Sequence, residues 1–172
     1  SNDVLILFIA SHGFIQDDKF RLQGHDYDPT APLTTSIAYD DIISDLLQVD
    51  CKKLVFIDAC HSGGARASVF AITDAIKEMS NTANGITTIV SSSPNEYAYE
   101  DASWENGAFT EAILHAFEGQ ADIDEDNIVS LYELFSFLQE EVPALVRGTK
   151  NQLQHPDMFQ KGFGEIPLFV ID

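Results

Sequence analysis

The sequence has 172 residues, 45% of them hydrophobic, with a formal charge of −19 from 28 acidic and 9 basic side chains. This length and composition fit one domain with a buried core, and the charge excludes nucleic acid and anionic membrane as partners while favouring cationic peptides. No apolar run reaches the ~20 residues of a membrane span and no signal peptide is visible, so we expect a cytoplasmic protein.

Apolar runs mark the expected strands. Residues 4–10 and 54–57 are continuously apolar, and residues 86–90 form a third run that is apolar apart from Thr87 and Thr88, a pattern typical of central strands covered on both faces. A fourth run, 167–171, begins at Pro167 and is typical of a strand start or a sheet edge. Residues 20–22 are expected to add a small hairpin.

Helical periodicity lies between these runs, and Pro143 is expected to bend or shorten the last helix. The helices are expected at residues 39–47, 68–79, 107–117 and 131–146. Strands alternating with helices are typical of an α/β fold, a three-layer α/β/α sandwich with a mostly parallel central sheet. No repeat or linker divides the chain, so we treat residues 1–172 as one domain.

The two cysteines, Cys51 and Cys60, are expected at the two ends of one strand. Nine extended residues at roughly 3.3 Å each separate them too widely for a disulfide. A reduced, intracellular protein follows. We interpret Cys51 as a small hydrophobic residue and Cys60 as a free thiol.

Cys60 and His12 both fall at the carboxyl ends of expected strands, which is where the active sites of such sheets usually lie. A tight turn at Gly63 and Gly64 would expose the sulfur near backbone N–H groups that favour a thiolate and an oxyanion. Gly13 would offer a further N–H. A Cys-His pair on two strand ends is a nucleophile and general base for acyl transfer.

Each half of this pair is a weak indication by itself, because such a histidine is more often structural and such a cysteine more often part of the core. Two alternatives to an enzyme of this kind are therefore an inactive scaffold that binds a partner, and a doubly wound ligand-binding or hydrolase domain with a coincidental pair.

The residues also resemble a family. His12-Gly13 after an apolar strand and DACHSGG from Asp58 to Gly64 resemble the caspase-like cysteine peptidases, in particular the metacaspase and bacterial caspase-homologue branch. The stretches SSSPNEYAYEDASWENGAFTEAI and GEIPLFVID resemble the substrate-binding strand with its following helix, and the last strand. The resemblance covers the whole chain and implies a Cys60-His12 dyad, an oxyanion hole from the N–H groups of Gly13 and Cys60, and no required cofactor.

The resemblance further implies a strand-helix block before the histidine strand, whereas this sequence opens at that strand. We therefore expect a peptidase domain incomplete at its N-terminus, with exposed apolar surface unless the absent segment or a partner chain covers it.

Substrate specificity is expected to be basic. The resemblance to metacaspases implies that Asp58 lines a pocket for arginine or lysine before the scissile bond. In animal caspases an arginine on the substrate-binding strand helps to hold the substrate aspartate. Overlaying that strand on this sequence puts Glu100 at the position of the arginine, so the charge there is negative instead of positive. Ser92 and Tyr97 are expected to line neighbouring pockets. The alternative for Glu100 is a solvated loop carboxylate. Ala10 stands where metacaspases often carry a serine that helps line the pocket, so a preference for acidic residues is the alternative to basic specificity.

An acidic stretch begins at Asp122 and resembles a calcium loop. Its carboxylates at loop positions 1, 3, 5 and 12 are Asp122, Asp124, Asp126 and Glu133. Asn127 stands in place of the usual glycine and tolerates a positive φ. The competing interpretation is a capping box, in which Ser130 and Glu133 begin a helix.

Two basic residues after the expected active-site turn, Arg66 and Lys77, are candidate self-cleavage sites unless a helix protects them. His25, His61, His115 and His155 are assigned no catalytic role.

Overall fold

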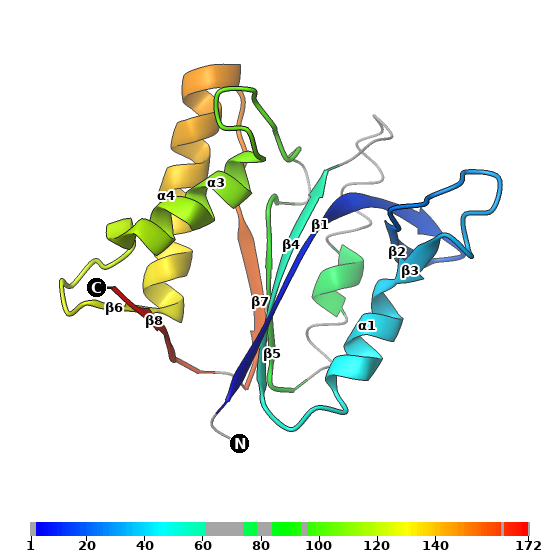
Figure 1. The fold of residues 1–172 in the computed structure, drawn as a ribbon, viewed down its shortest axis with the longest axis horizontal. Coiled ribbons are helices and arrows are strands. Elements are labelled where there is room, and N and C mark those ends of the chain that lie inside the picture. The colour runs from blue at the N-terminus through cyan, green and yellow to red at the C-terminus, as the bar shows by residue number, and fades with distance from the viewer. Residues whose placement is uncertain (1–2, 61–73, 79–83, 94–95, 163, 172) are drawn as a thin grey trace.

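The structure, a computed structural model, describes residues 3–60, 74–78, 84–93, 96–162 and 164–171 (Figure 1). A six-stranded sheet has the order β3-β2-β1-β4-β5-β7. Its strands are β1 (Val4–Gln16), β2 (Lys19–Gln23), β3 (Ser36–Ala38), β4 (Lys52–Cys60), β5 (Ile86–Val90) and β7 (Asp157–Lys161).

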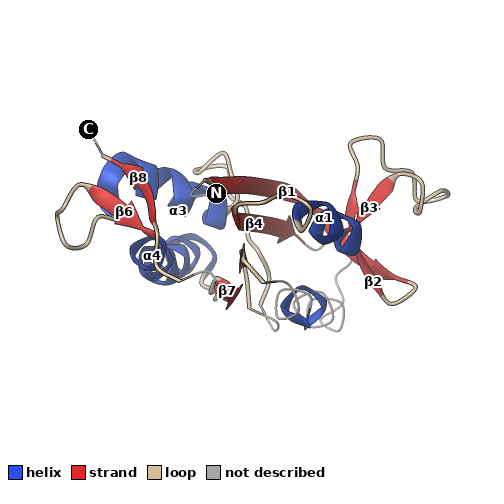
Figure 2. Ribbon diagram, turned by 90° about the horizontal axis from the view of Figure 1, so that it is seen from below, coloured by secondary structure: helices blue, strands red, loops and turns tan. Residues whose placement is uncertain are grey.

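Helices cover both faces of this sheet, as Figures 1 and 2 show. The helices α3 (Ala108–His115) and α4 (Leu131–Lys150) lie on one face, and α1 (Tyr39–Leu46) lies on the other. A π-helical turn, Ala116–Gln120, continues α3, and a small sheet of β6 (Ile128–Ser130) and β8 (Pro167–Val170) lies beside α3 and α4.

Alternation along β4 creates two cores. Leu54 and Phe56 pack with α3 and α4, whereas Val55 and Ile57 pack with α1. Successive side chains of a strand point to opposite faces, so a strand that is buried on both faces is apolar at most of its positions. The expected three-layer fold class is confirmed, with a parallel β1-β4-β5 centre and antiparallel strands at the edges.

Three details of the sequence prediction change. The last helix runs through Pro143 to Lys150 without being shortened, and the Pro143 ring is buried on its core face. The last strand, β8, pairs with β6 and lies outside the central sheet. The antiparallel strand β7 was not predicted, because DMFQK has neither an apolar run nor a clear alternation.

The first strand is also longer than expected. It continues through His12 and, from Gly13 onward, pairs with β2 across a tight turn at Asp17 and Asp18, which have φ of 53° and 57°. Two left-handed residues suit the twist of a two-residue hairpin turn. Gly13 is required by packing, since an added Cβ would lie 2.4 Å from the Phe20 ring.

The expected helix 68–79 is described only at its helical residues 74–78. Arg66, His61 and the Gly63-Gly64 turn lie outside the described residues. Lys77 lies in the helical piece 74–78.

Two large apolar side chains of β1 are exposed. Ile6 is 53% exposed and Phe8 is 41% exposed. Over Val4–His12 this strand is paired with β4, and its pairing with β2 begins only at Gly13. A strand that is paired with β4 on one edge and carries exposed apolar side chains favours association with another chain segment.

We therefore predict that the protein associates through this surface, and that Ile6→Lys weakens the association because a charge cannot be buried there without a partner. Light scattering at rising concentration measures this, with Leu33→Lys as a control at an exposed apolar residue away from β1. A wild type that stays monomeric at every concentration would contradict the prediction.

Candidate active site

The register of β1 with β4 brings the two predicted dyad positions together. Val4 pairs with Lys52, and the parallel pairing continues without a shift to His12 and Cys60. Adjacent strands lie about 4.8 Å apart, so the two backbones are neighbours at the carboxyl ends of both strands. His12 is exposed. The side chain of Cys60 lies outside what the structure describes.

A cavity of about 840 Å³ opens beside His12. The carboxyl ends of β1 and β4 form one wall, and the other walls come from residues 100–107, helix α3 and the last residue of α4. Three predicted site residues line it together, namely His12, Asp58 and Glu100. Ser92 is buried and Tyr97 is half-buried, and the described lining contains neither of them. Their role in neighbouring pockets stays a prediction.

Asp58 is buried, with 6% of its surface exposed, and its two oxygens have different surroundings. Oδ2 accepts a hydrogen bond from the Thr110 hydroxyl at 2.6 Å. Oδ1 has no hydrogen-bond partner among the described residues. A buried carboxylate oxygen without a partner is costly, so an arrangement of this kind favours a ligand that can donate to it.

Asp58 lies at the N-terminal end of α3. The N-cap residue Gly107 has no side chain to cap the helix, and an added Cβ there would lie 2.9 Å from Asp58 Oδ2. The helix N-terminus favours a negative charge at this position. The aspartate of β4 therefore takes the place that a capping side chain usually occupies.

Burial raises the pKa of Asp58 above its ordinary value of 3.8, and the charge of Glu100 raises it further. The hydroxyl groups of Thr110 and Ser91 act in the opposite direction because they stabilise the anion. Desolvation is the largest of these effects, so ionised Asp58 is less stable here than in water. A bound cation would reverse that balance.

The cavity is acidic as a whole. Among the described residues, four carboxylates line it, from Asp58, Glu100, Asp101 and Glu105, together with one ammonium group, that of Lys150. Lys150 Nζ lies 2.6 Å from Asp101 Oδ2 and lowers the pKa of Asp101 well below its usual range. With that pair neutralised, the remaining carboxylates make the cavity attractive to a positively charged side chain.

The segment that precedes the cavity-lining residues 100–107 in the sequence is held at Ser91 and Tyr99 by a buried glutamine, which the sequence analysis did not identify. Gln154 is 0% exposed, donates to the Ser91 carbonyl at 2.8 Å and accepts from the Tyr99 N–H at 2.8 Å. His155 Nδ1 lies 2.8 Å from Glu96 Oε1 on the same segment. Polar residues in a loop carry no pattern that predicts burial, so Gln154 could not be found from the sequence.

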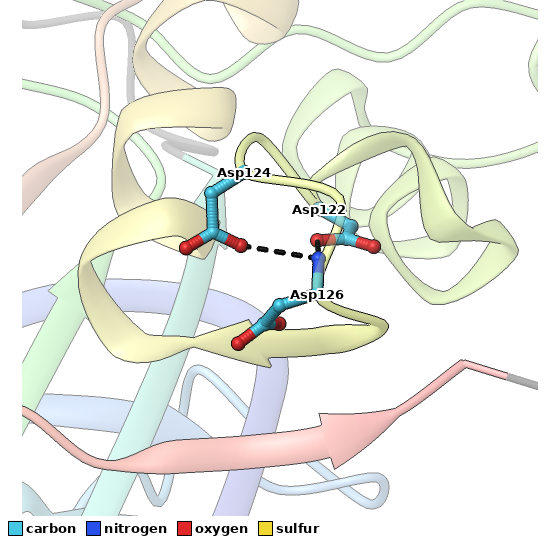
Figure 3. Close-up of side chains that lie close together, drawn as sticks. All are labelled: Asp122, Asp124 and Asp126. Carbon is cyan, nitrogen blue, oxygen red and sulfur yellow. Dashed lines mark hydrogen bonds between the residues drawn. The ribbon is translucent and has the colours of Figure 1, made fainter.

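The acidic loop adopts a compact form (Figure 3). Oxygen atoms of Asp122, Asp124 and Asp126 lie within 4.8 Å of one another, and Asn127 has φ of 66°. The predicted capping box is confirmed, since Ser130 accepts from the Glu133 N–H and Glu133 accepts from the Ser130 N–H. Glu133 Oε1 also accepts from the N–H groups of Ile123 and Asp124. Both Glu133 oxygens thus bind backbone amides, and calcium stays a hypothesis.

Comparison with known proteins identifies the family. The model of the caspase domain, a peptidase family, matches residues 1–165, so the chain belongs to the caspase domain family. Membership is consistent with a cysteine peptidase that acts on proteins.

Among solved structures, the chain is similar to protein GSU0716 from Geobacter sulfurreducens, a structural-genomics target. The TM-score is 0.59 at 18% identity, covering 100% of this chain and 73% of that chain, which supports the fold. No curated protein matches. No helix among the described residues is long and apolar enough to cross a membrane.

We predict that Asp58→Asn stabilises the fold at pH 7. Because the pKa of Asp58 is raised, its contribution to stability is complete below its ordinary value of 3.8 and is lost as the pH rises through the folded-state value. Asparagine keeps an acceptor for Thr110 and removes the charge. Thermal unfolding should show a higher midpoint than wild type at pH 7 and a smaller difference near pH 4.

An equal or larger gain near pH 4 would contradict this prediction. Asp45→Asn, at an exposed aspartate of α1, is the matched control and should change the midpoint little at either pH.

Loss of the capping box in Glu133→Ala should lower the free energy of unfolding by about 1 kcal/mol at pH 7. Urea unfolding measures this, with the exposed Glu140→Ala on the same helix as control. The backbone N–H of Ser130 lowers the pKa of Glu133, so the contribution is present above its ordinary value of 4.5 and is lost at lower pH. An unchanged unfolding energy would show that the box contributes nothing.

The calcium hypothesis has its own test. If the loop binds calcium, isothermal titration of the wild type should show heat of binding at sub-millimolar calcium concentrations. Asp122→Asn should lower the calcium affinity. The absence of any heat in the wild type would remove the hypothesis.

Proposed function

We propose that the protein is a cysteine endopeptidase of the metacaspase-like branch that cleaves peptides after arginine or lysine. The observation that carries this proposal is the shared acidic cavity of His12, Asp58 and Glu100, in which a buried carboxylate oxygen has no partner among the described residues. A substrate guanidinium or ammonium group would satisfy that oxygen. No cofactor is required, and we expect the protein to act in the cytoplasm.

The reaction begins with proton transfer from the Cys60 thiol to His12. The thiolate attacks the peptide carbonyl carbon, and the developing oxyanion is held by the N–H groups of Gly13 and Cys60. His12 then donates the proton to the leaving amine as the C–N bond breaks. Water, activated by His12, hydrolyses the thioester and restores the thiol.

Specificity follows from charge and shape. Asp58 accepts from the substrate cation at the base of the cavity, and Glu100 and Glu105 attract it from the rim. A side chain of aspartate would meet the same carboxylates and be repelled. The Lys150-Asp101 pair leaves one cation in the cavity already engaged, so it offers little attraction to an acidic substrate.

Paired fluorogenic peptides test this proposal. Peptides with arginine, citrulline or aspartate before the scissile bond separate charge from shape, because citrulline is a neutral isostere of arginine. We predict turnover of the arginine peptide, loss of at least about a hundredfold in His12→Ala, and complete loss in Cys60→Ala. Cys51→Ala is the matched control and should retain activity.

In the same assay Asp58→Asn should lower kcat/KM for the arginine peptide by on the order of a hundredfold. Faster cleavage of the aspartate peptide would overturn the basic specificity while leaving a cysteine peptidase. Iodoacetamide that modifies Cys60 no faster than a model thiol, together with no turnover of any peptide, would favour the inactive scaffold.

A further inference from the structure

We propose that Thr110 is a positioning residue for basic specificity: its hydroxyl engages Oδ2 of Asp58, so that Oδ1 alone is presented to the cationic side chain of the substrate. This inference rests on the proposed function, since it assumes that Asp58 binds a basic side chain.

The contact itself is short and directed. Thr110 Oγ1 lies 2.6 Å from Asp58 Oδ2, and both residues line the cavity. Thr110 is the third residue of α3, so its hydroxyl is fixed to a helix packed in the core by Phe109 and Ala112. Hydrogen bonds from a hydroxyl to a carboxylate at such distances are among the stronger ones in proteins.

Gly107, the N-cap residue of α3, lies beside the same oxygen and leaves room for it because it has no side chain. An added Cβ at Gly107 would lie 2.9 Å from Oδ2 and 3.7 Å from Oδ1. Oδ2 therefore lies next to the N-terminus of α3 and accepts from the Thr110 hydroxyl, and these two neighbours favour one orientation of the carboxylate. Oδ1, buried and without a partner among the described residues, is the oxygen left for a ligand.

The hydroxyl also favours the ionised form of the carboxyl. In the described part of the lining, the charged or titratable groups besides Asp58 are those of His12, Glu100, Asp101, Glu105 and Lys150. Burial and the charge of Glu100 raise the pKa of Asp58, and the hydroxyl groups of Thr110 and, to a smaller extent, Ser91 lower it. Without the hydroxyl, Asp58 would hold its proton to higher pH, and a protonated carboxyl binds a cation poorly.

The test measures binding in the Cys60→Ala background, which separates Asp58 from the catalytic groups. The probes are acetyl-arginine methylamide and its neutral isostere acetyl-citrulline methylamide, titrated by NMR between pH 5 and pH 8. We expect Thr110→Val to weaken arginine binding about three- to tenfold at pH 6. The midpoint of its pH dependence should move upward, and Thr110→Ser should restore both.

Thr149→Val is the matched control, because its hydroxyl bonds to the Leu145 carbonyl on α4 and lies outside the cavity lining. Gly107→Ala is a second variant that keeps the hydroxyl but crowds Oδ2, and it should also weaken arginine binding. This variant keeps the inference testable if Thr110→Val does not fold.

Arginine binding that is unchanged in both Thr110→Val and Gly107→Ala would overturn the positioning role while leaving the basic pocket in place. Equal binding of the arginine and citrulline probes to the Cys60→Ala protein that retains Thr110 would overturn the basic specificity itself. The failure of the positioning role and the failure of the proposed function are therefore distinguishable. If Thr110→Ser bound the arginine probe as weakly as Thr110→Val does, the hydroxyl alone would not account for binding. The effect would then be assigned to packing of the methyl group, which would contradict the proposal.

Discussion

The parallel pairing of β1 with β4 is the constraint on which the rest of the site depends. Nine successive pairs, from Val4-Lys52 to His12-Cys60, run without a bulge, and a slip by one residue would move every side chain of one strand to the opposite face. The apolar positions that fill the two cores fix this register. The same packing that holds the sheet together therefore sets His12 opposite Cys60 and Ala10 opposite Asp58.

Asp58 affects the stability of the fold and, in the proposed function, also determines substrate specificity. Its carboxylate takes the capping place at the N-terminus of α3, where Gly107 has no side chain, yet burial raises its pKa and makes the anion costly. A protein selected for stability alone would do better with asparagine at this position. The retained charge is consistent with a site that gains its stabilisation from a bound cation, which is the stability cost often found at functional sites.

Sequence patterns predicted the elements with strong periodicity and the residues that lie at strand ends. The bounds of strand β5 and helix α1 were predicted almost to the residue. Burial in the core requires an apolar run in a strand and helical spacing of apolar residues in a helix, so both patterns are visible in the sequence. Strand β7 was missed, since a half-buried antiparallel strand with polar residues has no such run.

Among the site residues, the cavity of His12, Asp58 and Glu100 could be anticipated from motif and charge. Thr110 could not be assigned, although a polar residue within the apolar stretch AFTEAIL was a signal. The role proposed for Thr110 depends on a contact between residues 52 positions apart, which only the packing of α3 against β4 creates. Gln154 is a similar case, because its two bonds join segments that no local pattern connects.

The most direct measurement is a crystal structure of the protein after reaction with a peptidyl arginine chloromethyl ketone. The account predicts one thioether bond, to the sulfur of Cys60, with the ligand guanidinium in hydrogen-bond contact with Oδ1 of Asp58 and the Thr110 contact to Oδ2 retained. Alkylation of Cys51 instead, or an adduct at Cys60 whose guanidinium lies in solvent away from Asp58, would contradict it.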